Sequence, residues 1–243
     1  MNPKDLRETQ QPRLLSATIE QPHYGNWIWH KGVEQATNRI ANWLVKGGNL
    51  WLTSDSVCGK THFMQALANE HPHLGYLHIT PNEDISTDPL RSWLSIIEQA
   101  SFWAIDLPAG VLNQETAYAI FHLIEYAKER QKPMLISWRS SQNPSSSQEK
   151  QAIPPELLTR LHTYERIEME APKSDEKLIA ILHSLATSLQ WQVKEHVLKT
   201  LISQYPRQLE LQTEALITLE KNSIDQRNRH LTRDKIHRII VEH

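Results

Sequence analysis

The segment SDSVCGKTHF, residues 54–63, contains the residue types best suited to chemistry. Gly59, Lys60 and Thr61 fit the end of the phosphate-binding pattern G-x-x-x-x-G-K-[ST]. In that pattern, backbone N–H groups and the lysine hold phosphate oxygens, and the Ser/Thr hydroxyl ligates magnesium. Ser54 stands where the pattern begins with glycine. The segment therefore predicts a nucleotide site that has lost one glycine.

Asp106 is the second candidate, because it ends the apolar segment FWAID at residues 102–106. An acid at this strand end in phosphate-loop proteins holds magnesium beside the nucleotide. A turn residue before Pro108 is the plain structural alternative. Leu107 follows, where hydrolysing enzymes of this kind carry a second acid that activates water. We therefore expect magnesium binding by Thr61 and Asp106, and no efficient hydrolysis by the chain itself.

These residues need strands and helices that alternate along the chain. Strands are predicted by short apolar runs at 49–53, 74–79, 102–106, 133–138 and 165–170. Helical spacing of apolar residues predicts helices at 32–45, 61–71, 90–100, 114–131 and 155–161. Such alternation is typical of βα units, so the predicted class is α/β with a five-stranded parallel sheet.

The alternation stops near residue 171, and helical segments follow at about 174–189, 193–204, 206–222 and 232–241. We therefore predict a flexible arm at 1–22, an α/β nucleotide-binding-like domain at 23–171 and a helical lid at 172–243. The polar stretch at 140–151 is rich in serine and glutamine, which favours a mobile surface loop.

Composition limits the partners of the chain. The 243 residues carry a net charge of −2, so bulk attraction to nucleic acid is absent. The basic segment 227–238 is the place where DNA contact would be local, although a solvated helix face explains it as well. No apolar run approaches the roughly 20 residues of a membrane span, and no secretory signal begins the sequence. The expected location is the cytoplasm.

Two other kinds of chemistry have no supporting pattern. The sequence contains 13 histidines but no H-E-x-x-H motif, and its single cysteine, Cys58, has no second cysteine for a disulfide or zinc site. The hydrolase motif G-x-S-x-G is also absent from the sequence. The only metal we expect is magnesium that arrives with a nucleotide.

Several segments, in order, resemble the DnaA/Hda type of the AAA+ family. They are LWLTSDSVCGKTHFMQALANE, FWAID, PMLISWR, PELLTRL, APKSDEKLIAIL and YPRQLELQ. They are similar to the family's Walker A loop, Walker B strand, sensor 1 strand, arginine-finger helix, lid linker and sensor 2 helix. The resemblance covers residues 20–241. It is greater to the shorter Hda-type regulators than to the initiator, since we expect no DNA-binding domain after the lid.

The resemblance implies a role for each matching residue. Gly59, Lys60 and Thr61 would hold the phosphates and magnesium of ADP or ATP, with Asp106 as the Walker B acid. Arg160, in LLTRL, matches the arginine finger, which projects into the nucleotide site of a neighbouring subunit. Arg207, in YPRQL, matches sensor 2, which reaches the nucleotide from the lid. Where the family's sensor 1 has a short polar residue, this chain has Trp138 and Arg139.

The resemblance also implies partners. They are the ATP-bound replication initiator DnaA, whose ATP hydrolysis the chain would promote as an inhibitor of DNA replication, and the DNA polymerase sliding clamp. The clamp would bind QQPRLLS at 10–16, whose spacing fits the clamp-binding motif poorly. A homo-oligomer is also open, and direct DNA binding is expected to be weak or absent.

Two alternative functions remain open at this stage. Gly59, Lys60, Thr61 and Asp106 suit an autonomous ATPase of a DNA-linked machine, such as a transposition or helicase-loading factor. Ser54 instead favours an adaptor with the AAA+ shape that no longer binds nucleotide. ATP turnover by the purified chain would favour the autonomous ATPase. Saturable binding of ADP or ATP would exclude the adaptor.

Overall fold

The structure is a computed structural model, and it describes residues 27–80, 88–110, 112–139, 155–189, 191 and 193–225. Several predictions from the sequence fall elsewhere. The arm at 1–22 with its clamp-like segment, the loop at 140–151 and the helix at 232–241 lie outside the described residues.

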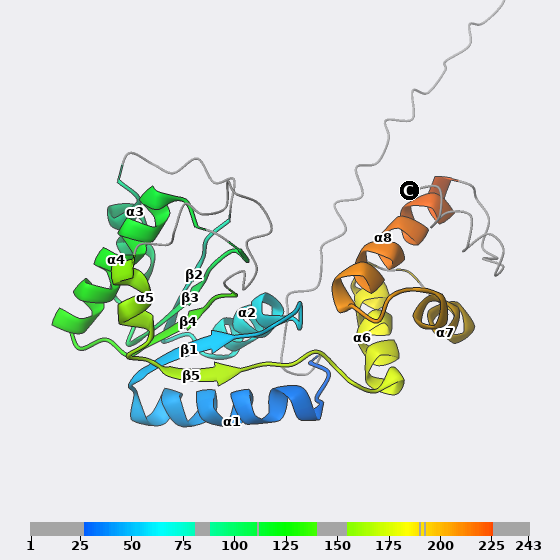
Figure 1. The fold of residues 1–243 in the computed structure, drawn as a ribbon, viewed down its shortest axis with the longest axis horizontal. Helices are drawn as coiled ribbons and strands as arrows, with labels where there is room; N and C mark the ends of the chain where they lie inside the picture. Colours follow the sequence, from blue (N-terminus) through cyan, green and yellow to red (C-terminus); the bar gives the residue numbers. More distant parts are fainter. Residues whose placement is uncertain are drawn as a thin grey trace, which may run out of the picture.

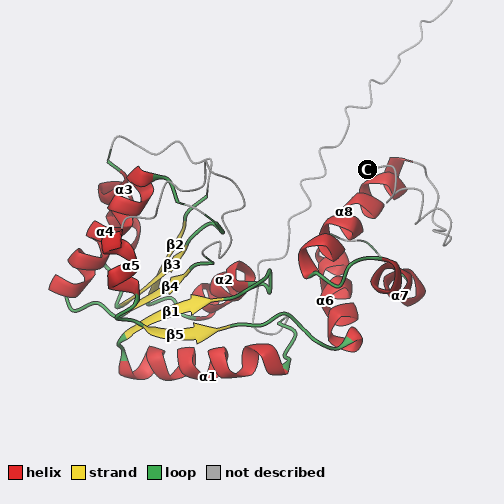
Figure 2. Cartoon of the chain, in the orientation of Figure 1, coloured by secondary structure: helices red, strands yellow, loops and turns green. Residues whose placement is uncertain are grey.

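Five parallel strands form one sheet, in the order β2-β3-β4-β1-β5 (Figures 1 and 2). They are β1 Asn49–Thr53, β2 Leu74–His78, β3 Phe102–Asp106, β4 Met134–Ser137 and β5 Glu165–Glu168. The crossovers place the end of β1, where the candidate phosphate loop starts, between β4 and β5. The α/β class with a five-stranded parallel sheet is therefore confirmed.

Helices cover both faces of this sheet. The first five are α1 Lys31–Lys46, α2 Lys60–Glu70, α3 Pro89–Ile97, α4 Gln114–Glu129 and α5 Pro155–Leu161. One hydrophobic cluster joins α1 and α2 to the sheet, and another joins α3, α4 and α5 to its opposite face. The alternation of strand side chains produces the two clusters. Trp103 and Ile105 belong to the α3–α5 cluster, whereas Ala104 between them belongs to the α1–α2 cluster.

Side-chain caps fix the starts of several helices. Asp88 accepts a hydrogen bond from the backbone N of Arg91 at the start of α3, and Asn113 accepts one from Thr116 at the start of α4. Ser174 caps the first helix of the lid by accepting from the backbone N of Lys177, at 3.3 Å. Such caps satisfy backbone N–H groups that have no partner within the helix.

The remaining helices are α6 Asp175–Ser188, α7 Glu195–Gln204 and α8 Leu209–Asp225, and they share a hydrophobic cluster of their own. Its fully buried members are Leu182, Ala186, Leu198, Leu201, Leu216 and Leu219. Figure 1 shows these helices beside the sheet, beyond the end of β1. A helical lid thus follows the α/β part, while the boundary near residue 171 stays a prediction.

Leu182→Ala is expected to lower the free energy of unfolding of the lid by about 2–5 kcal/mol, because a fully buried leucine is removed and a cavity is left. Denaturant titration followed by circular dichroism measures the loss. Ile179→Ala, on the same helix but only partly buried, is the matched control and should lose less. Equal losses in the two variants would contradict the separate lid core.

No helix within the described parts of the chain combines the length and the apolar character that crossing a membrane requires.

Candidate nucleotide-binding site

The candidate phosphate loop connects β1 to α2. Gly59 is the residue before α2, and its φ of 87° lies in the left-handed region, which glycine adopts without steric cost. Lys60 and Thr61 then form the first turn of α2, which contains no acidic residue. The backbone N of Lys60 already hydrogen-bonds the Cys58 thiol, and the positive dipole end of the helix favours an anion.

Lys60 points back into the loop. Its Nζ donates a hydrogen bond to Oγ of Ser54, which in turn donates to the backbone O of Ser56 at 2.8 Å. Burial lowers the pKa of Lys60, and the nearby Asp106 carboxylate opposes this lowering. The ammonium is thus partly removed from water and lies within electrostatic range of Asp106, as the sequence pattern predicts.

Asp106 ends β3 and is only 1% exposed. Its Oδ2 lies 3.2 Å from Nδ1 of His78, which ends β2 in register with it. Ser137 ends β4 in register with Asp106, and its buried Oγ has no hydrogen-bond partner among the described residues. Leu107 packs in the α3–α5 cluster. The strand ends therefore bring together an acid, an imidazole and a hydroxyl, but no second acid follows Asp106.

Trp138 and Arg139 follow β4 directly, at the position that the resemblance assigns to sensor 1. Trp138 is fully buried in the α3–α5 cluster. Arg139 lies within electrostatic range of Lys60. Ser137, one residue before Trp138, pairs with Asp106. The sensor 1 assignment stays a prediction.

A cavity of about 500 Å³ lies between the phosphate loop and the lid. From the α/β side it is lined by Trp27, Ile28, His30, Val57, Cys58, Gly59, His62 and Gln65, and from the lid by residues of α6 and α8, including Ile181, Leu185, Leu209 and Thr213. Cavities of this volume suit ligands of nucleotide size. The cavity meets the loop at Gly59, so one ligand can contact both.

Trp27 forms an aromatic wall of this cavity. Its ring stacks on that of His62 at 5.7 Å between centroids and packs edge-on against Phe63 at 5.3 Å. Burial lowers the pKa of His62, which keeps the imidazole neutral near pH 7. The Nε1 of Trp27 is buried and has no hydrogen-bond partner among the described residues. His62 belongs to the quoted phosphate-loop segment but was given no role from sequence, and Trp27 lies outside every quoted motif, so the part that each plays in the cavity was missed.

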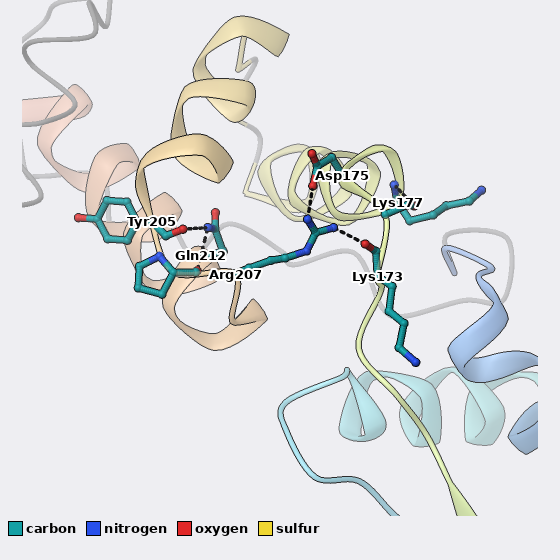
Figure 3. Close-up of polar contacts among 8 residues, drawn as sticks. Lys173, Asp175, Lys177, Tyr205, Arg207 and Gln212 are labelled. Carbon is teal, nitrogen blue, oxygen red and sulfur yellow. Dashed lines mark hydrogen bonds and ion pairs between the residues drawn. The ribbon is translucent and has the colours of Figure 1, made fainter.

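Arg207 lies between the start of α8 and the start of α6 (Figure 3). One guanidinium nitrogen is 2.7 Å from Oδ1 of Asp175, and another donates to the backbone O of Lys173. The side chain is 48% exposed, and it is not one of the residues that line the cavity. In this conformation Arg207 joins the lid to its linker, and the sensor role stays a prediction.

Arg160 lies on the opposite face of the sheet from α2. It belongs to α5, and its Nε is 2.7 Å from Oε1 of Glu125 on α4. The guanidinium also lies over the ring of Phe121, 5.9 Å from its centroid. The side chain is 38% exposed. The structure thus brings Lys60 and Asp106 together but leaves Arg160 outside that site.

Similar folds occur in solved proteins of DNA replication initiation and of Holliday junction branch migration. Domain III of the replication initiation protein DnaA from Thermotoga maritima has a TM-score of 0.65 and 17% identity, covering 90% of this chain and 95% of that one. A DNA replication initiation factor has a TM-score of 0.55 and 17% identity, covering 84% and 69%. The Holliday junction branch migration motor RuvB of T. maritima has a TM-score of 0.61 and 10% identity, covering 92% and 72%.

The chain has the AAA+ fold. No family model matches it. A curated relative, an uncharacterized protein of Haemophilus influenzae, is 28% identical over 187 residues, which are 75% of this chain and 77% of that protein. These likenesses show the fold, and they leave the activity to be argued from the residues.

A magnesium nucleotide fits the residues present. Within the described residues, no group of three or more His, Cys, Asp or Glu side chains could hold a metal ion alone. Exposed Thr61 offers one hydroxyl and Asp106 one carboxylate, so a magnesium ion held there would take its other ligands from a nucleotide or from water. The orphaned hydroxyl of Ser137 and the acid-free start of α2 supply further polar contacts for a phosphate.

Proposed function

We propose that the chain is an Hda-like regulator of DNA replication initiation, which docks on ATP-bound DnaA and promotes hydrolysis of the ATP that DnaA holds. The position of Arg160 supports this proposal best. Its guanidinium is partly exposed on the face of the sheet opposite α2. A residue there cannot serve the chain's own Lys60 loop, but it can enter a site on a neighbouring protein.

The chain's own pocket binds ADP or ATP with magnesium. Lys60 and the N–H groups that follow Gly59 hold the phosphates, and Thr61 and Asp106 hold the metal. The cavity beside Trp27 takes the rest of the nucleotide. Bound magnesium supplies positive charge against the phosphate oxygens. The buried Leu107 provides no base, so the nucleotide serves mainly to fix the α/β part and the lid in a conformation that docks.

Arg160 acts in the site of DnaA as an arginine finger. Its planar guanidinium donates two parallel hydrogen bonds, a geometry that matches phosphate oxygens. To reach them it must leave Glu125, and the 38% exposure of its own side chain lets water and phosphate compete for the guanidinium. Exchange of one carboxylate for the polyphosphate of ATP is therefore favourable. An arginine supplied in trans accelerates phosphoryl transfer by about 10³–10⁵-fold.

The sliding clamp of the DNA polymerase is the second proposed partner. Its contact would be the segment QQPRLLS at 10–16, which lies outside the described residues. Binding there would connect the inactivation of DnaA to clamps already loaded on DNA. The proposal needs no direct DNA contact, in keeping with the net charge of −2.

An autonomous ATPase is the second candidate function, and one observation favours it. Nδ1 of His78 is 3.2 Å from Asp106, and an imidazole beside a carboxylate is a pair that enzymes use as a general base. This candidate requires ATP turnover by the purified chain alone, lost in His78→Ala. The proposed regulator requires turnover only when DnaA is present.

The test of the proposed function adds the purified chain to DnaA that carries ATP. The steady-state rate of ATP hydrolysis is expected to rise with chain concentration and to saturate. The chain alone and DnaA alone are the controls. If the hydrolysis rate of the mixture equals the sum of the rates of the chain alone and DnaA alone at every concentration, the proposed regulatory function is wrong.

A further inference from the structure

Ser54 occupies the centre of the phosphate loop. It is 4% exposed, and its Oγ donates to the backbone O of Ser56 at 2.8 Å, accepts from Nζ of Lys60 and is also in hydrogen-bonding contact with the Cys58 thiol. The hydroxyl is therefore an internal hydrogen-bond partner for the ammonium that a phosphate would otherwise bind.

The backbone conformation at position 54 does not require glycine, so any effect of serine there comes from its side chain. Gln131 is the only non-glycine residue with a positive φ among the described residues, so Ser54 lies outside the left-handed region that favours glycine. Gly59, with φ of 87°, is the residue of this loop that needs glycine. Serine at position 54 thus adds a side chain without straining the chain.

Burial strengthens the contact between Ser54 and Lys60. The pKa of Lys60 is lowered first by burial, which means that water solvates its ammonium poorly. A hydrogen bond to a charged group in such surroundings is stronger than one between neutral groups in water. A phosphate that enters the loop must break this bond before it gains Lys60.

We propose that the Ser54 hydroxyl competes with nucleotide phosphate for Lys60 and thereby sets the nucleotide affinity of the site. The inference rests on the proposed function, since it takes the loop to be a site for ADP or ATP. Removal of the hydroxyl frees the ammonium and the carbonyl of Ser56 from their internal bond. Affinity for a nucleoside diphosphate then rises by about tenfold, which is near the lower end of what one charge-assisted hydrogen bond contributes.

Calorimetric titration with Mg-ADP of the full chain, Ser54→Ala and Ser54→Gly tests this inference. Both variants are expected to bind about tenfold more tightly than the natural chain, and equally, because both lack the hydroxyl and neither relieves backbone strain. Tightening in Ser54→Gly alone would overturn the inference in favour of a backbone effect. Unchanged affinity in both variants, or no binding by any of the three chains, would overturn it too.

Two controls isolate the hydroxyl. Ser56→Ala removes an exposed serine from the same loop but keeps the carbonyl that Ser54 bonds, so its affinity should equal that of the natural chain. In a Lys60→Ala background, Ser54→Ala should no longer tighten binding, since the competition is gone. Thermal melting checks that each variant is folded.

The assay uses this chain alone, which keeps the inference separate from the proposed function. Failure to stimulate DnaA would remove the regulatory function and leave the Ser54 results standing. Equal Mg-ADP affinity in the natural chain and both Ser54 variants would remove the inference and leave the role of Arg160 standing.

Discussion

Arg160→Ala is expected to abolish the stimulation of ATP hydrolysis in DnaA, lowering the stimulated rate by about 10³-fold or to the level of DnaA alone. The guanidinium that would meet the developing charge on the phosphoryl group is absent, and alanine has no donor to replace it. The measurement is the hydrolysis rate at saturating chain, because saturation separates chemistry from docking.

The control variant is Arg166→Ala. Arg166 is an exposed residue of β5, and its guanidinium lies over the ring of Trp51 at 5.7 Å. Arg166→Ala removes the same charge from a nearby surface. The rate of ATP hydrolysis that this variant stimulates should stay within about twofold of the rate with the natural chain, since exposed charges contribute little. Equal losses in Arg160→Ala and Arg166→Ala would point to a general charge effect on docking and would contradict the finger.

Glu125, the ion-pair partner of Arg160, needs a control of its own. Arg160→Ala strips Glu125 of its ion-pair partner, and Oε1 of Glu125 is a buried atom. An unpaired buried carboxylate destabilises a fold. Glu125→Gln combined with Arg160→Ala removes that charge, so this double variant should be stable and still inactive. Recovered stimulation in the double variant would mean that the single variant had failed only by misfolding.

Lys60→Ala is expected to weaken binding of ADP and ATP by about 100-fold, because the charge-assisted hydrogen bonds to the phosphates, about 1.5–3 kcal/mol each, are lost. Alanine is a strong helix former, so the first turn of α2 should be kept. Calorimetric titration in the presence of magnesium measures the change.

Lys46→Ala is the matched control for this loss of charge. Lys46 is exposed at the end of α1 and is not among the residues that line the cavity. Its affinity for nucleotide should be unchanged. Nucleotide binding that survives Lys60→Ala would show that the cavity does not use the phosphate loop, and the proposed pocket would then be wrong.

The sequence predicted the elements around the site well, because each one carries its own local signal. The bounds of β1, β3 and α5 agree with the predicted 49–53, 102–106 and 155–161. These strands are short apolar runs that end in polar or turn residues, and they are buried from both sides, as a central parallel strand should be. Lys60 and Asp106 were predicted at one site; β4 lies between the strands that precede and hold them, and the Asp106 carboxylate is within electrostatic range of the Lys60 ammonium.

The start of α8 was predicted less well, for a physical reason. The sequence pattern indicated a helix from residue 206, whereas α8 begins at Leu209. The side-chain amide of Gln212 donates to the backbone O of Tyr205 and of Pro206, which holds the preceding turn open (Figure 3). A contact of this kind depends on how the lid packs, and helical periodicity carries no sign of it.

The rest of the candidate site was hidden because register decides it. His78 and Ser137 meet Asp106 only because three strands, far apart in sequence, end at the same level of the sheet. Trp27 reaches the cavity from a segment that precedes α1 and carries no motif. Such contacts depend on how distant strands pair. A single sequence predicts the strands themselves but not which strands lie side by side or in what register.

The most direct test of the account is the release of labelled phosphate from ATP that is bound only to DnaA. DnaA is loaded with ATP labelled at the γ-position, the chain is filled with unlabelled ADP, and the two are mixed for a single turnover. The account predicts rapid release of label with the natural chain and release at the rate of DnaA alone with Arg160→Ala. Release at the rate of DnaA alone with both chains would contradict the claim that this protein drives hydrolysis in its partner.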